Sequence, residues 1–281
     1  MPSPRRSRRG VTLLELVVVV AITGLLLGLL LGAVQSARLS AARMTAMNTA
    51  RQLLLATHNY ADGHADQMPN VDGEGPGWGR TVIQSLCPSM EADPDGLPPA
   101  FLRLKSDPSR GTDPSGVAPF PPIPPPGFTA QPTPDQACSF AFNPLAYAVG
   151  ARLATVAPDG LSTTVALTEH YGVCGPSEFA WCFRSAVCIG TNGKPSPCVG
   201  ERSHRTTFAD GVMFDDVWPV TTVSRGVPTT VGSLPLTFQV RPSLAQCDPR
   251  VPQSSLPGGL LVGRLDGSAH FVRASVEPAA F

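Results

Sequence analysis

The stretch that decides the fold is RRSRRGVTLLELVVVVAITGLLLGLLLGAV, residues 5–34. Arginines and a glycine come first, and an uncharged apolar run from Leu16 to Val34 closes the stretch. Such a run approaches the roughly 20 apolar residues that an α-helix needs to cross the hydrocarbon core of a bilayer. Because positive charge is retained on the cytoplasmic side, the arginines predict a cytoplasmic N-terminus and an exported remainder of the chain.

Glu15 is the one charged residue between Gly10 and Val34, and it tests each interpretation of this segment. A carboxylate near lipid is costly unless a partner neutralises it. A cleaved secretory signal would be shorter and would end in a small-x-small site, whereas Ser40-Ala41-Ala42 lies well past the apolar run. A twin-arginine export signal has a milder apolar region. A plain signal anchor explains the length and orientation but not the glutamate.

The same features together resemble the class III signal of type IV prepilins and pseudopilins. These signals have a short basic leader, here residues 1–10, a glycine at the cut, a glutamate fifth in the mature chain, and a continuous apolar helix. The resemblance implies that a prepilin peptidase cuts between Gly10 and Val11 and methylates the new α-amine of Val11. The family usually has phenylalanine at that position, so Val11 departs from the common pattern.

The resemblance also implies a role for Glu15 in assembly. The new α-amine is a cation, and burying it among packed helices is expensive unless an anion lies beside it. Glu15 lies about one helical turn from Val11, so its carboxylate could meet the amine of its own chain or that of a neighbouring subunit. In the family the neighbour's amine is the partner, which gives the register of assembly.

The helix is expected to continue beyond the membrane. Apolar and small residues recur at steps of three and four at Leu39, Ala42, Ala46, Ala50, Leu53, Thr57 and Tyr60. This pattern is typical of an amphipathic helix. It predicts one helix over residues 11–60, about 75 Å long, that ends near Gly63. The alternative is a membrane helix followed by a separate amphipathic one.

The rest of the chain, residues 61–281, reads as an exported β-rich domain. Two apolar runs flank Asp266-Gly267, and an Asp-Gly pair between such runs is a strong hairpin signal. Prolines crowd residues 93–134, which predicts a loop or polyproline-like insert outside the folded core. The expected fold class is therefore α+β and pilin-like: a long N-terminal helix, its N-terminal half transmembrane, packed on an antiparallel sheet with long Pro/Gly-rich loops.

Four segments of the chain from residue 56 onward resemble the pilin-like family known by its DUF1559 domain. The family's opening segment is matched by ATHNYADGHADQMP (residues 56–69), and a Ser-Tyr-x-x-Asn motif by Ser139, Phe140 and Asn143. PDGLSTTVALTEHYG (residues 158–172) resembles an Asp-Gly-x-Ser-x-Thr…Glu motif through Asp159, Gly160, Ser162, Thr164 and Glu169. LPGGLLVGRLDGSAHFV (residues 256–272) resembles the closing strand pair. The chain departs from the family at Leu256, where a histidine-containing approach is usual.

The sequence has seven cysteines: Cys87, Cys138, Cys174, Cys182, Cys188, Cys198 and Cys247. In an exported domain disulfides are the favoured interpretation, ahead of buried free thiols and of a metal site. The odd number predicts at least one unpaired thiol, and the pairing stays open. Glu169 and His170 lie near Cys174, but the cysteine spacing matches no zinc module, so we expect no metal site.

Composition argues against nucleic acid as a partner. The chain has 21 basic and 21 acidic residues, and loss of the four leader arginines would leave 17 against 21. A mildly acidic protein lacks the surplus of cations that phosphate binding requires. The sequence also carries no nucleophile elbow, metalloprotease or phosphate-loop motif, so we expect neither catalytic residues nor a cofactor.

These observations predict a structural subunit of a type IV pilus-like filament or a type II secretion pseudopilus. Its expected partners are prepilin peptidase, other pilin or pseudopilin subunits, the inner-membrane assembly machinery and membrane lipid. It would be a single-pass inner-membrane protein with a periplasmic body before assembly. The alternative is a membrane-anchored extracytoplasmic binding protein or enzyme, tethered by the same helix.

Overall fold

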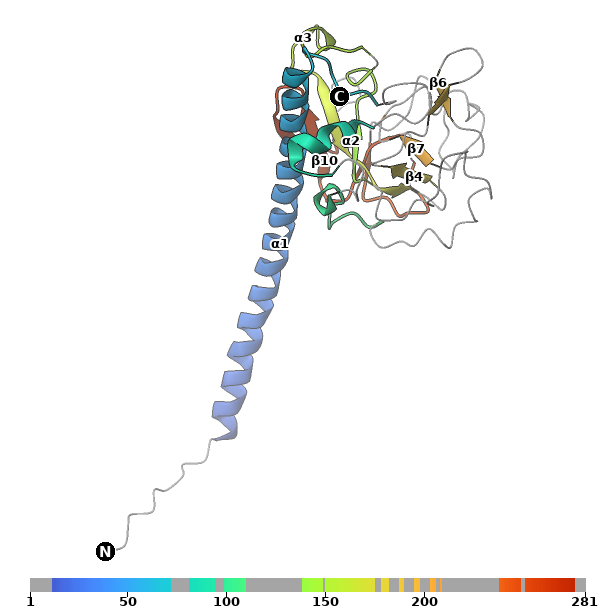
Figure 1. The fold of residues 1–281 in the computed structure, drawn as a ribbon. Coiled ribbons are helices and arrows are strands. Elements are labelled where there is room, and N and C mark those ends of the chain that lie inside the picture. Colours follow the sequence, from blue (N-terminus) through green and yellow to red (C-terminus); the bar gives the residue numbers. More distant parts are fainter. Residues whose placement is uncertain are drawn as a thin grey trace, which may run out of the picture. The chain divides into compact units, whose positions relative to one another are not determined.

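The structure is a computed structural model of the chain (Figure 1). It describes residues 12–71, 81–93, 99–109, 138–148, 150–174, 208, 238–248 and 251–275, and the backbone of four short strands between 178 and 205. The chain forms two compact units, residues 1–44 and 45–281.

Helix α1 (Leu13–Gly63) is a single helix of 51 residues, which confirms the prediction of one long helix over two separate ones. Its sequence carries no proline, so no position interrupts the backbone ladder. The chain leaves the helix just after Gly63, where Ala65 and Asp66 adopt positive φ and the Asp66 N–H donates to the carbonyl of Ala61 at 2.8 Å. The part of α1 from Ala46 onward belongs to the second unit and is buried on one side.

A four-stranded antiparallel sheet forms the centre of the second unit. Its strands are β1 (Phe140–Phe142), β2 (Val165–Glu169), β10 (Gly259–Arg264) and β11 (Ala269–Arg273), in the spatial order β1-β2-β10-β11. The predicted hairpin joins β10 to β11: Gly267 has a φ of 86°, and the Ser268 N–H donates to the Asp266 carboxylate at 2.9 Å. The expected α+β class is confirmed.

One face of the sheet packs against the second-unit part of α1. Ala46, Ala50, Leu53 and Thr57, all predicted from the helical periodicity to share one face, are buried. Small side chains let the helix approach the strands, and Gly263 on β10 lies where Leu54 of the helix and Leu167 of β2 meet. A hydrogen bond also crosses this interface: His58 Nε2 lies 2.7 Å from the carbonyl oxygen of Leu265.

The opposite face of the sheet is covered by the chain between residues 238 and 256. Successive residues of a strand point to opposite faces, so Leu261 faces the helix while Leu260 and Val262 face the other side of the sheet. They form a separate cluster with Phe238, and Val240 packs against it. Two short parallel strands, β8 (Gln239–Val240) and β9 (Gln253–Ser254), lie in this cover. We call residues 251–256 the β9 segment.

Several shorter elements complete the described structure. They are α2 (Val82–Leu86), η1 (Cys87–Met90), η2 (Ala100–Leu102), α3 (Leu153–Val156), β3 (Val173–Cys174), β4 (Glu178–Trp181), β5 (Val187–Ile189), β6 (Pro195–Pro197) and β7 (Ser203–Arg205). Helix α2 begins with a capping box in which Thr81 and Gln84 satisfy each other's backbone N–H groups.

The predicted proline-rich insert, residues 93–134, departs from expectation where it is described. Leu102 and Leu104 are buried in the main core, and Asp107 and Ser109 are buried in a polar network. The prediction that this insert stays outside the core is therefore wrong for residues 99–109, because proline content does not report the apolar side chains between the prolines. Residues 110–134 lie outside the described part.

Candidate functional site

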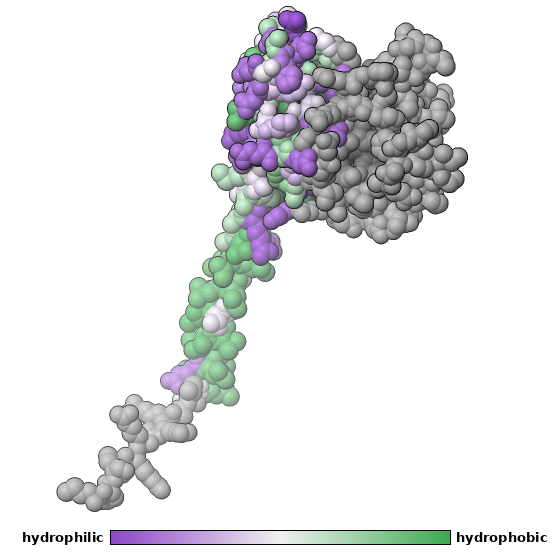
Figure 2. All heavy atoms as spheres, in the orientation of Figure 1, coloured by the Kyte–Doolittle hydropathy of each residue, from purple (hydrophilic) through white to green (hydrophobic). Residues whose placement is uncertain are grey.

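The first candidate site is the N-terminal stretch of α1, whose side chains present a continuous apolar surface. Large apolar residues from Leu13 to Val34 are exposed, with Leu13 at 80% and Leu29 at 67%. Figure 2 shows this surface as an apolar stretch of the helix. By length and composition, α1 is able to cross a membrane. A surface of this kind is stable in lipid or against other apolar helices.

Glu15 lies in the first turn of α1 and closes a capping box with Thr12. The backbone N–H of Thr12 donates to Glu15 Oε2 at 2.8 Å, and the Thr12 hydroxyl donates to the same oxygen at 2.9 Å. In return, the backbone N–H of Glu15 donates to Thr12 Oγ1 at 3.2 Å. Each residue thus satisfies a backbone donor that the start of a helix leaves without a partner.

This turn places a carboxylate at the positive end of the helix dipole, close to where the mature chain is expected to start. Both Thr12 bonds converge on Oε2. In the described chain Glu15 therefore bonds to a neutral group, and its charge is available to a cation brought by another molecule. The predicted cleavage and methylation positions, Gly10 and Val11, lie outside the described residues.

Thr12 was missed as a functional residue, although the sequence carries its signal. A Thr-x-x-Glu spacing just before an apolar run is the pattern of a capping box, and residues 12–15 read Thr-Leu-Leu-Glu. The glycines of the same helix, Gly24, Gly28 and Gly32, have nothing within 4 Å of an added Cβ. Packing within the chain therefore gives no reason for their small size.

The second candidate site is a buried polar cluster around two carboxylates in the body. Asp107 Oδ2 accepts hydrogen bonds from Ser139 Oγ at 2.6 Å and from the Gly172 N–H at 2.9 Å. Asp107 Oδ1 accepts from the N–H and the hydroxyl of Ser109, at 2.9 and 2.7 Å. These bonds tie the loop after η2 to Ser139, just before β1, and to Gly172 in the chain that follows β2.

Glu169, the second carboxylate, ends β2 and holds the β9 segment. Its Oε1 accepts from the Ser255 N–H at 2.6 Å and from the Ser255 hydroxyl, and its Oε2 lies 3.3 Å from Ser254 Oγ. Burial, opposed in part by these serine hydrogen bonds and reinforced by the negative charge of Asp107, raises the pKa of Glu169 to about 7. We call Asp107, Glu169, Ser139, Ser254 and Ser255 the carboxyl clasp.

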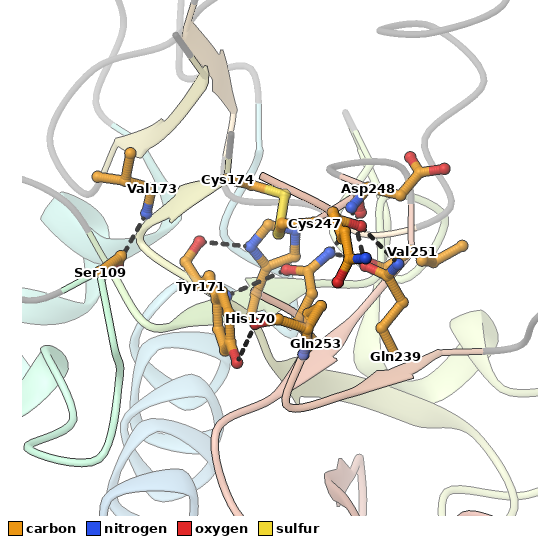
Figure 3. Close-up of a disulfide and its surroundings, with 12 residues drawn as sticks. Ser109, His170, Tyr171, Val173, Cys174, Gln239, Cys247, Asp248, Val251 and Gln253 are labelled. Carbon is orange, nitrogen blue, oxygen red and sulfur yellow. Dashed lines mark hydrogen bonds between the residues drawn. A yellow bond between two sulfur atoms is a disulfide. The ribbon is translucent and has the colours of Figure 1, made fainter. Parts of the chain in front are cut away.

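Cys174 and His170, which lie close enough in sequence to raise the question of a metal site, have other partners (Figure 3). Cys174 forms a disulfide with Cys247, 73 positions away, so it is not a thiolate ligand. His170 Nδ1 lies 2.7 Å from the carbonyl oxygen of Tyr171, and Glu169 bonds to serines. Within the described residues, no group of three or more His, Cys, Asp or Glu side chains is placed to hold a metal ion.

The disulfide confirms the expectation of disulfide bonding and gives a pairing that the sequence left open. It joins β3 to the cover of the sheet, beside the ring of Tyr171. Cys87 and Cys138 are buried in the main core as thiols. Cys182 and Cys198 lie outside the described residues, and only the backbone is described at Cys188.

Comparison with known protein families matches residues 5–31 to the prokaryotic N-terminal methylation motif. This motif indicates a type IV pilin-like protein that is processed by a prepilin peptidase and anchored in the membrane by its N-terminal helix. Comparisons with curated proteins and with solved structures give no match.

Proposed function

We propose that this protein is a structural subunit of a type IV pilus-like filament or a type II secretion pseudopilus. Prepilin peptidase cuts between Gly10 and Val11 and methylates the α-amine of Val11. The subunit then joins others through its apolar helix, with Glu15 neutralising the Val11 amine of a neighbour. The observation that carries the proposal is the methylation motif over residues 5–31.

The geometry of the first turn supports this role for Glu15. A carboxylate bonded to a neutral threonine in an otherwise apolar, exposed stretch is poorly compensated once lipid surrounds it. A cationic amine from a companion helix would provide the missing charge. Glu15 lies in the first turn of α1, close to the position where the α-amine of a processed chain would lie.

The body fits an extracytoplasmic location. A disulfide forms in an oxidising compartment, and the arginines before α1 place the chain after the helix outside the cytoplasm. The partners that follow are prepilin peptidase, other pilin or pseudopilin subunits, the inner-membrane assembly machinery and lipid. No catalytic role is assigned to the body.

We further propose that the body is of the DUF1559 type. Residues of its motifs have structural roles in the second unit, which supports the proposal. His58 bonds to the carbonyl of Leu265, and the Asn143 amide donates to the carbonyl of Val165 at 2.8 Å. Glu169 bonds to Ser255, next to the position where Leu256 replaces the usual histidine.

The mature N-terminus is the first test. The protein is extracted from membranes of its host, and the mass of its N-terminal peptide is measured. The proposal predicts a chain that starts at Val11 with one added methyl group on the α-amine. A protein that still starts at Met1 would exclude processing and favour the tethered alternative.

The variant Glu15→Gln distinguishes the effect of the negative charge from the effect of the helix cap. Glutamine preserves a capping box, because its side-chain oxygen still accepts from the Thr12 N–H. If Glu15 only caps the helix, the variant assembles normally; if its charge pairs with a neighbour's amine, assembly falls by about tenfold or more. The readout is the fraction of protein in high-mass assemblies after mild cross-linking.

Glu91→Gln is the matched control, because Glu91 is an exposed carboxylate of the body and the chemical change is the same. It is expected to assemble like the wild type. Normal assembly of Glu15→Gln alongside normal processing would contradict the proposed charge pair and leave the helix as a tether only.

A further inference from the structure

The carboxyl clasp contains two buried carboxylates, Asp107 and Glu169, each held by its own set of hydrogen bonds. Asp107 is 3% exposed and Glu169 is 1% exposed. The hydrogen bonds that their oxygens accept come from serine hydroxyls and backbone N–H groups, which are neutral donors. A negative charge on Glu169 is costly in such a place, and the charge of Asp107 adds to that cost, so the protonated form of Glu169 is favoured.

The hydrogen-bond partners of the Ser254 hydroxyl also favour a protonated Glu169. The Ser254 hydroxyl lies 3.0 Å from the carbonyl oxygen of Leu256 and 3.3 Å from Glu169 Oε2, and it accepts from the Leu256 N–H at 3.2 Å. A hydroxyl has one hydrogen and cannot donate to both oxygens. Both contacts are satisfied if Ser254 donates to Leu256 and a protonated Glu169 donates to Ser254.

The position of this proton matters for the fold, because Glu169 is the point where β2 holds the β9 segment. The Ser255 N–H and hydroxyl both bond to Glu169, and the Ser255 hydroxyl also contacts Ser106 Oγ at 2.8 Å. Asp107 is held separately, by hydrogen bonds from Ser139 and Gly172. The disulfide holds the cover at Cys247, four residues before the β9 segment.

We propose that Glu169 is a proton-operated latch: its protonated side chain holds the β9 segment against the sheet, and loss of the proton loosens that segment. The disulfide keeps the neighbouring chain attached when the latch is open. The device is independent of the proposed assembly function, since it lies wholly in the second unit.

Several charged and titratable groups lie around the latch, and Asp107 among them favours the neutral acid. Asp107, from the loop after η2, adds negative charge to the burial that raises the pKa of Glu169. Tyr171, next along the chain from β2, has its pKa raised by burial and by both carboxylates, against an opposing effect of Arg241 from between β8 and β9. His170 bonds to the Tyr171 carbonyl, and Arg103 donates to the carbonyl of Ser109 at 2.7 Å.

The direction of the pH effect follows from linkage. The pKa of Glu169 is about 7 in the closed state, against 4.5 for the ordinary side chain that the open state presents. The latch is therefore fully stabilising below pH 4.5 and weakens as the pH rises through 7. The opening constant is expected to rise on the order of tenfold to a hundredfold between pH 5 and pH 8.

Hydrogen exchange of the full chain in detergent micelles tests the latch. Protection of the backbone amides in the β9 segment is measured at pH 5 and pH 8, after correction for the intrinsic pH dependence of exchange. We expect the corrected protection of this segment to fall with rising pH, and the β10–β11 hairpin, residues 259–273, to stay better protected than this segment at pH 8. Equal protection of the β9 segment at both pH values would overturn the proposal.

Glu169→Gln removes the titration and imitates the neutral acid, because its amide can donate to Ser254 and its oxygen can accept from Ser255. The variant is expected to keep its protection at pH 8, and Glu91→Gln is expected to behave like the wild type. Unchanged pH dependence in Glu169→Gln would assign the effect to another group. Independently of any variant's stability, infrared titration of the wild type should show a carboxylic-acid band that disappears near pH 7, and its absence would overturn the latch.

Discussion

Two glycines of β10 occupy places where a side chain would collide, and the colliding atoms differ. A Cβ on Gly259 would lie 2.1 Å from the carbonyl oxygen of Val272 on β11, which is backbone. A Cβ on Gly263 would lie 3.0 Å from the side-chain ends of Leu54 and Leu167, which can shift. The backbone contact is the stricter constraint, because moving it separates the hairpin strands.

Gly259→Ala is therefore expected to lower the free energy of unfolding by about 3 kcal/mol or more, as overpacking against backbone does. Gly263→Ala should cost less, on the order of 1 kcal/mol, because leucine side chains can adjust. Gly63→Ala is the control, since an added Cβ there meets nothing within 4 Å. Urea unfolding of the full chain in micelles measures all three; equal losses for Gly259→Ala and Gly63→Ala would contradict the argument.

Thr12 is expected to set the start of α1. Thr12→Ala removes the hydroxyl that bonds to Glu15 and should cost about 1 kcal/mol at the first turn, whereas Thr12→Ser retains the cap. Hydrogen exchange of residues 12–20 in micelles reports the difference. Equal protection in the alanine and serine variants would show that the capping box does not stabilise this turn.

At the scale of elements, α1 joins a membrane-type segment to a packing face. Leu54 is 1% exposed beside Gly263 of the sheet, while the next residue, Leu55, is 61% exposed. The same residue type thus occupies both sides of the helix. Its contribution to stability depends on which side it faces.

Leu54→Ala is expected to cost about 2–5 kcal/mol, because it leaves a cavity between the helix and the sheet. Leu55→Ala should change stability by less than about 0.5 kcal/mol, as an exposed position does. The two neighbours form a matched pair in urea unfolding. Similar losses for both would mean that Leu55 is covered in the folded protein.

For the whole molecule, the disulfide closes a long loop of chain. Cys174 and Cys247 are 73 positions apart. Closing a loop of this size lowers the conformational entropy of the unfolded chain, which stabilises the folded state by about 4 kcal/mol. The double variant Cys174→Ser/Cys247→Ser should lose about that stability. It should also make urea unfolding insensitive to a reductant, whereas a wild type insensitive to reductant would contradict the bond's role.

The stability of the whole body is also expected to depend on pH through Glu169. Its raised pKa means that stability is highest below pH 4.5 and falls as the pH approaches 7, by an amount on the order of 3 kcal/mol. The difference in melting temperature between Glu169→Gln and the wild type isolates this group from other carboxylates. It should be small at pH 4.5 and favour the variant at pH 8; a difference that does not vary with pH would contradict the prediction.

The sequence by itself determined the features that depend on neighbours along the chain. The apolar run, Glu15 and the arginines define the N-terminal segment; the three-and-four spacing through Leu53 and Thr57 defines the buried face of α1; and Asp266-Gly267 defines the hairpin. Local hydrogen bonds and periodicity produce these features, so a single stretch contains their signal.

Only the tertiary structure decided what meets across long separations. It joined Cys174 to Cys247 and placed Leu102 of the proline-rich stretch in the core. It also buried Asp107 and Glu169 and brought Ser255 to Glu169. Such contacts depend on how the helix, the sheet and its cover pack together. The sequence does not show whether an aspartate or a serine will face water or a buried carboxylate. Burial, which the fold alone sets, is the main reason why the pKa of Glu169 is raised to about 7.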